Sequence, residues 1–176
     1  DLRQSLPRAE WAKAVAVHEE GGREGRWKLK GNCPKEWETK LGKLRFQLRF
    51  MDNSKQFGVF AEQSPHWKWV ASRPQKLEPR PRLLNLFGYT GAASLVAAQA
   101  GWHVTHVDAS KPAVAWGRRN QELSGMAQEP IRWIIEDAMT FVKREVKRGN
   151  KYEAIMLDPP AFGRGPTGEF WKVERD

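Results

Sequence analysis

Short apolar runs alternate with helix-like segments after residue 82, and this alternation is the strongest constraint on the fold. Two strands joined through a helix run parallel, because the crossover returns the chain to the same edge of the sheet. The alternation therefore predicts an α/β protein with a parallel sheet wound with helices. The predicted strands are residues 83–87, 102–107, 131–135 and 152–157.

The helix boundaries in this part of the chain carry clear signals. An alanine-rich helix ends near residue 100. Ser110 is placed to cap the next helix, Pro112 falls in its first turn, and Gly125 ends it. Asp137 is placed to cap a third helix. Helical spacing predicts that this third helix turns four side chains inward: Ala138, Phe141, Val142 and Val146.

The first 78 residues are less regular. Residues 43–51 alternate apolar and polar side chains, which predicts a strand with one buried face and one basic, exposed face. Residues 10–17 fit a helix or a strand, residues 21–31 are typical of a glycine-rich loop, and residues 57–61 are predicted to form a short strand. A short helix is predicted near Pro65.

Two prolines within residues 77–82 predict a linker. The composition changes at the same place. Residues 1–82 hold 18 basic and 10 acidic residues, whereas residues 83–176 hold 12 and 11. We therefore predict a basic, β-containing region over residues 1–78 and an α/β domain over residues 79–176.

The uneven charge bears on the partner. A net charge of +9 and nine tryptophans, five of them before residue 70, favour contact with a polyanion such as RNA, although a basic surface also serves solubility. A second basic stripe is predicted on one helix, with a solvated helix face as the alternative explanation. Its members are Lys143, Arg144, Lys147, Arg148 and Lys151.

Several classes of protein are disfavoured. No apolar run approaches the about 20 residues of a membrane-spanning helix, and no signal peptide opens the chain. The single cysteine, Cys33, has no partner for an internal disulfide, and no Cys/His cluster predicts a metal site. We therefore expect a cytoplasmic protein that uses no metal.

Glycines or acidic residues follow each predicted strand. Gly88 and Gly91 follow the first, Asp108 the second, Asp137 the third and Asp158 the fourth. Ligands of open α/β sheets bind at the carboxyl ends of the strands, so these residues are expected at one edge. Each of them alone has a plain structural explanation as a turn, a loop acid or a helix cap, but together they indicate a ligand site.

The glycine spacing narrows the ligand. A dinucleotide site favours G-x-G-x-x-G, whereas Gly88 and Gly91 are followed by Ser94 without paired glycines. A ligand with ribose and adenine but no phosphate fits better, with Asp108 at the ribose and Asp137 at the adenine amino group. S-adenosylmethionine has that shape. A nicotinamide-dependent oxidoreductase remains an alternative, because it shares the glycines and Asp108.

The segment after the fourth predicted strand indicates what kind of substrate group the site can hold. Pro159 and Pro160 remove two N–H donors, so Asp158 and nearby carbonyls offer acceptors that can hold an exocyclic amine. Phe162 offers a face on which a flipped base can stack. Residues 162–168 contain three glycines, typical of a mobile lid, and Arg164 there is placed to touch a phosphate. A plain turn after a strand is the alternative.

The segments NLFGYTGAASL, HVDASKPAV, EDAMTFV and DPPAFGRGPTGE resemble successive motifs of class I S-adenosylmethionine-dependent methyltransferases, which have a Rossmann-like sheet. With FGVFAEQ upstream, they resemble the family of bacterial ribosomal-RNA large-subunit methyltransferases and its uncharacterised relatives. The resemblance implies methylation of a base in RNA. It implies catalytic roles for Asp158, Pro159, Pro160 and Phe162. It implies cofactor contacts from Gln63, Phe87, Gly88, Tyr89, Thr90, Gly91, Asp108, Ala109, Asp137 and Ala138.

Two departures from the family pattern keep a third interpretation open. Class I sheets have seven strands, and four are recognised here, so residues 152–157 are expected to form an open edge. We expect either that the natural protein continues beyond residue 176, which would make this domain incomplete at its C-terminus, or that something else covers the edge. Related cytosine-C5 methyltransferases use a cysteine beyond the Asp-Pro-Pro motif, but Cys33 lies far upstream of it. A non-catalytic RNA-binding fragment is therefore a further alternative.

Overall fold

The computed structural model describes residues 7–19, 25–51, 54–73, 79–160, 162–164 and 170–172. Contacts divide the chain into two compact units, Asp1–Glu38 with Leu48–Gly58, and Thr39–Gln47 with Val59–Asp176. The domain division at residues 78 and 79 stays a prediction, although the contacts divide the chain elsewhere. No helix of the described ranges is long and apolar enough to cross a membrane.

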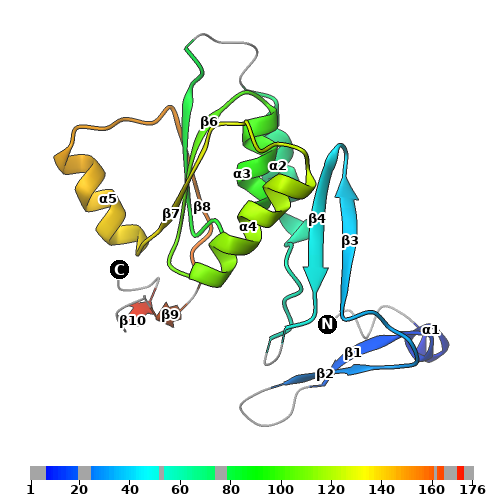
Figure 1. Cartoon of the computed structure of the whole chain (residues 1–176). Helices are drawn as coiled ribbons and strands as arrows, with labels where there is room; N and C mark the ends of the chain where they lie inside the picture. The colour runs from blue at the N-terminus through cyan, green and yellow to red at the C-terminus, as the bar shows by residue number, and fades with distance from the viewer. Residues whose placement is uncertain are drawn as a thin grey trace. The chain divides into compact units, whose positions relative to one another are not determined.

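The second unit contains a four-stranded parallel sheet in the order β7-β6-β5-β8 (Figure 1). This order confirms the predicted Rossmann-like α/β fold, and it places β8 at an edge of the described sheet. The strands are β5 (Arg82–Leu86), β6 (His103–Asp108), β7 (Ile131–Ile135) and β8 (Ala154–Leu157).

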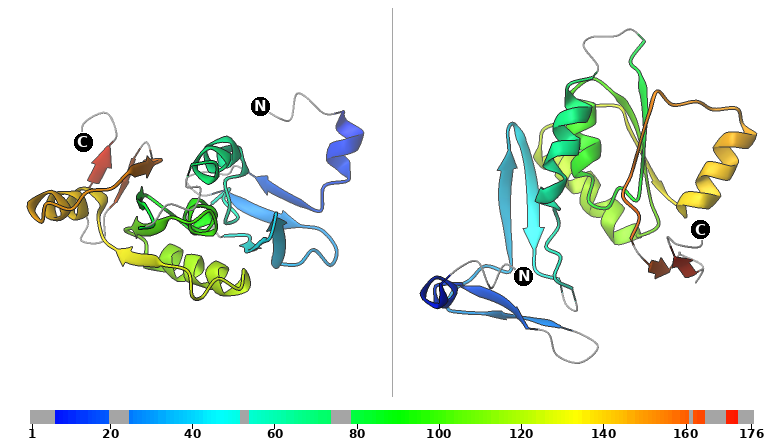
Figure 2. Two further views of the ribbon diagram at one scale, coloured as in Figure 1. Left: turned by 90° about the horizontal axis from the view of Figure 1, so that it is seen from above. Right: turned by 180° about the vertical axis from the view of Figure 1, so that it is seen from behind.

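Helices cover both faces of this sheet, as Figure 2 shows. On one face α2 (Ser64–Ala71) and α3 (Ala92–Gln99) pack with Leu83 and Val104. On the other face Ala138 and Phe141 of α5 (Ala138–Lys147) pack against neighbouring strand residues. The remaining helix, α4 (Lys111–Leu123), is capped by Ser110, as predicted.

One inward side chain of α5 was predicted wrongly. Ala138 and Phe141 are buried and Val142 is half-buried, but Val146 is 74% exposed. Glu145 takes the inward position and is only 3% exposed. Its carboxylate accepts hydrogen bonds from the side chains of Arg148, Asn150 and Tyr152, which satisfy the buried charge.

The segment before α2 also differs from its prediction. Residues 57–60 form no strand, and residues Ala61–Gln63 form a short 3-10 helix, η2. The Phe57 carbonyl accepts a hydrogen bond from the Arg49 amide, but Gly58, at φ 119°, then turns the chain. A strand cannot continue through that turn. The predicted helix near Pro65 is confirmed as α2.

The N-terminal residues form short elements. Both structures predicted as alternatives for residues 10–17 occur, since α1 (Arg8–Ala12) precedes β1 (Ala16–Glu19). The loop predicted for residues 21–31 is wrong over β2 (Arg26–Leu29), which pairs antiparallel with β1. The Trp27 ring of β2 packs 4.6 Å from the Phe50 ring, which gives this strand an apolar contact despite its basic neighbours.

The remaining strands form two pairs, β3 (Glu36–Leu41) with β4 (Leu44–Arg49), and β9 (Phe162–Arg164) with β10 (Phe170–Lys172). The alternation predicted for β4 is confirmed, because Leu44, Phe46 and Leu48 are buried.

Candidate functional site

The turn from β5 into α3 has an unusual backbone. Within residues 87–91, hereafter the 87–91 loop, Phe87 (φ 55°) and Tyr89 (φ 51°) adopt the left-handed region although neither is glycine. Gly91, at φ 83°, is the residue directly before α3. Non-glycine residues in this region cost of order 1–3 kcal/mol each, and such residues cluster at ligand sites.

Hydrogen bonds from β6 hold this loop in place. The Gly88 amide donates to the Val107 carbonyl (3.1 Å), and the Tyr89 amide donates to Asp108 Oδ2 (2.8 Å). Within the loop, the Gly91 amide donates to the Gly88 carbonyl (3.0 Å). The strained conformation is therefore fixed by contacts of the chain itself.

The two glycines are also required by their neighbours. A Cβ on Gly88 would lie 2.5 Å from Nδ1 of His106, and a Cβ on Gly91 would lie 2.7 Å from the Trp133 ring. His106 is fully buried, and its Nδ1 is 2.9 Å from Ser94 Oγ. Burial lowers the pKa of His106 to about 3, against a smaller opposing effect of the Tyr89 backbone.

Asp108 lies directly beside the loop. Its Oδ2 accepts from Tyr89, and its Oδ1 accepts from the Ser110 amide at 2.8 Å. Burial raises the pKa of Asp108, and these two backbone N–H groups act in the opposite direction. A carboxylate has about four acceptor positions, so two remain for donors other than these two backbone N–H groups. The half-buried Ala109 follows it at the same edge.

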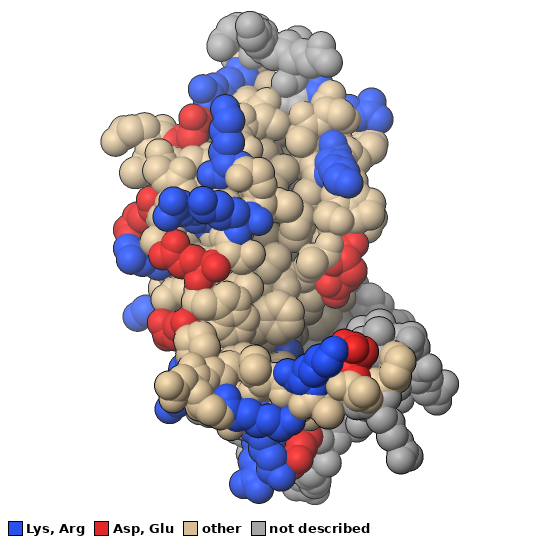
Figure 3. Space-filling view, turned by 90° about the vertical axis from the view of Figure 1, so that its right-hand side faces the viewer, with Lys and Arg blue, Asp and Glu red and all other residues tan. Residues whose placement is uncertain are grey.

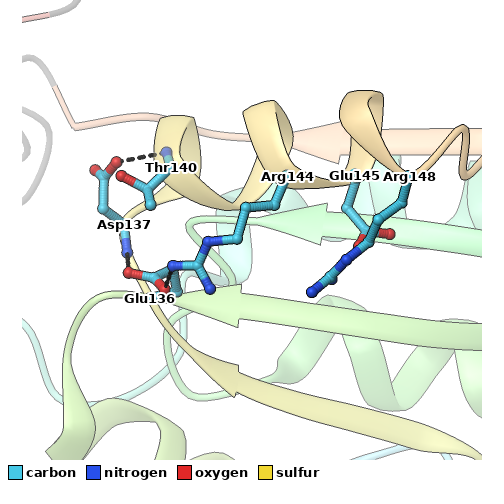
Figure 4. Close-up of polar contacts among 6 residues, drawn as sticks. All are labelled: Glu136, Asp137, Thr140, Arg144, Glu145 and Arg148. Atoms are coloured by element: carbon cyan, nitrogen blue, oxygen red, sulfur yellow. Dashed lines mark hydrogen bonds and ion pairs between the residues drawn. The ribbon is translucent and has the colours of Figure 1, made fainter.

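Asp137 follows β7 and caps α5, as predicted (Figure 4). Its Oδ1 accepts from the Thr140 amide at 2.8 Å, and Arg144 pairs with the adjacent Glu136. Asp137 itself is half-buried and Ala138 is buried. The cap uses one oxygen of the Asp137 carboxylate, and no hydrogen bond within the described residues engages the other.

Asp158 follows β8 and has a partner that is distant in sequence. Gln63, at the end of η2, donates from Nε2 to Asp158 Oδ2 at 2.7 Å. The Gln63 Oε1 in turn lies 2.5 Å from Nδ1 of His66. The structure thus brings together two residues that were predicted to have different roles, one at the cofactor and one at the acceptor.

The other residues predicted at the acceptor are described in part. Pro159 is half-buried and Pro160 is exposed. Phe162 begins β9, but its side chain and those of the rest of residues 162–168 lie outside the described part, so the stacking face and the lid stay predictions.

Sequence reasoning missed several side chains around the loop. His106 lies beneath Gly88, and Phe60 and Trp116 flank the Tyr89 ring at 5.4 and 6.4 Å between ring centroids. The Thr90 side chain is buried, and Asn120 Nδ2 donates to the Thr90 carbonyl at 3.0 Å. The sequence around these residues carries no local signal that singles them out, since His106 shares its strand with the polar residues His103 and Thr105.

The described residues hold no group of three or more His, Cys, Asp or Glu placed to bind a metal ion. The candidate site consists of the 87–91 loop, the acidic residues and the Asp-Pro-Pro segment, which follow the carboxyl ends of the parallel strands. This combination is typical of nucleoside-binding α/β enzymes.

Comparison with known proteins identifies the class. Residues 16–172 match the S-adenosylmethionine-dependent methyltransferase family, and the chain belongs to this family. The crystal structure of the SAM-dependent methyltransferase from Agrobacterium tumefaciens is 46% identical, with a TM-score of 0.89 over 96% of this chain and 54% of that one.

Curated relatives carry a more specific name. Ribosomal RNA large subunit methyltransferase K/L from Hahella chejuensis is 38% identical over 121 residues, which is 68% of this chain and 16% of that protein. The protein of the same name from Desulfotalea psychrophila is 30% identical over 154 residues, 86% of this chain and 20% of that protein. The chain thus spans a fifth or less of the length of these relatives.

Proposed function

We propose that this chain forms the S-adenosylmethionine-binding part of a methyltransferase that modifies a base in RNA, with ribosomal RNA as the substrate class. The observation that carries the proposal is the bond from the Tyr89 amide to Asp108. It joins a strained loop, typical of close approach to a ligand, to a carboxylate with spare acceptor positions.

The residues at the loop fit this cofactor. The backbone of Phe87, Gly88, Tyr89, Thr90 and Gly91 would hold the methionine part, because these residues lie between the carboxyl end of β5 and the start of α3. Asp108 and Ala109 would hold the ribose. Asp137 and Ala138, where the α5 N-terminus begins, would hold the adenine. The bound cofactor would supply a methyl group on a positively charged sulfur, from which a nucleophile can displace it.

The acceptor base would lie at Asp158, Pro159 and Pro160. The Asp158 carboxylate and the Pro159 carbonyl accept hydrogen bonds, so they can hold the hydrogens of an exocyclic amine and orient its nitrogen. Gln63 bonds to one Asp158 oxygen and so restricts the orientation of the carboxylate. Phe162 would stack on the base. The protein's contribution is chiefly alignment of the reacting atoms and exclusion of water.

RNA is the proposed partner because the named relatives act on ribosomal RNA and the chain is basic overall. Figure 3 shows Lys and Arg interspersed with Asp and Glu on one face. On α5, Arg144 and Arg148 are paired with Glu136 and Glu145. The exposed lysines of the stripe are better placed for phosphates, since no ion pair engages them in the described part. They are Lys143, Lys147 and Lys151.

The cofactor part of the proposal is tested by calorimetric titration with S-adenosylhomocysteine and, separately, with NAD. S-adenosylhomocysteine should bind and NAD should not. Asp108→Ala should weaken binding about tenfold or more, because it removes the ribose acceptor and releases the Tyr89 amide. Glu122→Ala, an exposed change on α4, is the matched control. Preference for NAD would instead establish the oxidoreductase alternative.

The acceptor part is tested with a methyl-labelled cofactor and ribosomal RNA. Label should enter the RNA, and Asp158→Ala should abolish transfer while the affinity for S-adenosylhomocysteine stays within about twofold of the parent. Replacing Lys143, Lys147 and Lys151 with glutamate should weaken RNA binding and flatten its salt dependence. Retention of RNA without any transfer would favour a non-catalytic RNA-binding role.

A further inference from the structure

Side chains from α4 and from Ser124, which follows it, form hydrogen bonds with backbone groups along one edge of β4. Ser124, directly after α4, accepts from the Arg45 amide at 2.9 Å and donates to the Arg45 carbonyl at 3.0 Å. Two residues on, the Gln47 amide donates to Asn120 Oδ1 at 2.9 Å, and Trp116 Nε1 donates to the Gln47 carbonyl at 3.0 Å. All of these residues belong to the second compact unit.

The spacing explains how a helix can take the place of a neighbouring strand. Trp116, Asn120 and Ser124 are four residues apart, about 6.0 Å along a helix axis for each step. Arg45 and Gln47 are two residues apart, about 6.8 Å along a strand. The two repeats therefore agree to within about 1 Å. Polar side chains of α4 thus satisfy peptide groups that would otherwise form an open strand edge.

The side-chain amide of Asn120 forms a second hydrogen bond, to the 87–91 loop. Its Nδ2 donates to the Thr90 carbonyl at 3.0 Å, while its Oδ1 accepts from Gln47. Asn120 is fully buried and Thr90 is 1% exposed, so water cannot replace either bond. One amide group thus joins β4 to the loop that contains the strained Phe87 and Tyr89.

Holding β4 does not by itself require this bridge. Ser124 and Trp116 already bond to β4, and Trp116 also contacts the loop through the Tyr89 ring. The Thr90 carbonyl lies between Tyr89 and Gly91, two of the left-handed residues of the loop. A donor at this position therefore acts on the peptide group that follows Thr90, one residue beyond the strained Tyr89.

We infer that Asn120 is a positioning residue that couples the attachment of residues 44–47 of β4 to the conformation of the 87–91 loop. The inference rests on the proposed cofactor role of that loop. Coupling between two sites is reciprocal. Cofactor binding therefore tightens the β4 attachment, and loss of the Asn120 bridge weakens cofactor binding without any direct contact being removed.

The test combines calorimetry with amide hydrogen exchange, using S-adenosylhomocysteine as the probe. In the parent chain the probe should slow exchange of the Gln47 amide about fivefold or more. Asn120→Asp keeps an acceptor for Gln47 and removes the donor to Thr90. It should lower the affinity for the probe about tenfold while the Gln47 amide stays protected in the free protein. Asn120→Leu introduces a side chain of similar size without hydrogen-bonding groups. It should lower the affinity for the probe and also remove the protection of the Gln47 amide.

Ser124→Ala is the matched control. It removes both bonds to Arg45 and leaves the Thr90 bond intact, so it should speed exchange of the Arg45 amide while the affinity for the probe changes less than about twofold. A purely structural role of Asn120 predicts instead that the Ser124 and Asn120 variants weaken binding alike.

The outcomes separate the two proposals. If the parent chain does not bind S-adenosylhomocysteine, the proposed function and the coupling both fail. If it binds and both Asn120 variants bind equally well, only the coupling is overturned. If the variants do not fold, hydrogen exchange of the parent chain alone tests the coupling. Exchange of the Gln47 amide that stays unchanged when S-adenosylhomocysteine binds contradicts it.

Discussion

Acid should destabilise this protein through His106. The ring is fully buried beneath Gly88, and burial lowers its pKa from 6.5 to about 3. The folded state therefore excludes a proton that the unfolded chain accepts. The stability held above pH 6.5 is lost progressively as the pH falls toward about 3, because unfolding releases the imidazole to bind the proton.

The size of the effect follows from these two values. Between pH 7 and pH 5 the unfolded chain changes from largely neutral to largely protonated at this histidine, while the folded chain stays neutral. Integrating the proton uptake gives a loss of about 2 kcal/mol in the free energy of unfolding. For a domain of this size that is a large share of a total of about 5–15 kcal/mol.

Urea unfolding at pH 5, 6 and 7 measures this loss in the parent and in His106→Gln, which cannot bind the proton. The variant is less stable at every pH because packing is lost. Between pH 7 and pH 5, however, its free energy of unfolding should fall by about 2 kcal/mol less than that of the parent. His103→Gln changes an exposed histidine of the same strand and should keep the parent's dependence. Equal pH dependence in the parent and His106→Gln would refute the reasoning.

Substitutions at three further positions test individual contacts by urea unfolding at pH 7. Gly88→Ala should cost about 1–3 kcal/mol, since its Cβ would press on the buried His106 ring; a neutral result would contradict this packing. Tyr152→Phe should cost about 1.5–3 kcal/mol, because the hydroxyl donates to Glu145 Oε2 at 2.6 Å; an unchanged midpoint would exclude that bond. Asp137→Ala should cost about 1 kcal/mol and Asp137→Asn far less, because asparagine also caps helices; equal losses would show that the cap contributes little.

The sheet and its helices were predictable because their signals are local. β7 occupies the same residues, Ile131–Ile135, that the apolar run predicts, and both predicted caps, Ser110 and Asp137, bond to amides three residues on. Capping and strand periodicity depend on neighbours within a few residues, which the sequence contains directly.

The errors arise where distant residues decide the structure. Val146 has the spacing of an inward residue, yet Glu145 is buried instead because Asn150 and Tyr152, beyond the helix, bond to its carboxylate. Similarly, the basic and glycine-rich surroundings of β2 predict a loop, but strand pairing with β1 and the ring contact of Trp27 outweigh that local preference.

The candidate site divides in the same way. The order of polar residues after the strands could be read from the sequence, because parallel strands end at one edge. The bond between Gln63 and Asp158 joins residues 95 positions apart, and the left-handed conformations of Phe87 and Tyr89 depend on tertiary contacts. Neither feature has a signal in the local sequence.

The strain in the 87–91 loop explains why several elements converge on it. Two non-glycine residues in the left-handed region would relax if the loop were free, at a gain of order 1–3 kcal/mol each. Val107 and Asp108 of β6 bond to Gly88 and Tyr89, and Asn120 of α4 bonds to Thr90. Because these partners belong to the folded chain, the loop adopts its conformation before any ligand binds. The loss of backbone entropy on ligand binding is therefore small. Substitutions at the supporting residues should therefore lower ligand affinity even where no supporting atom touches the ligand.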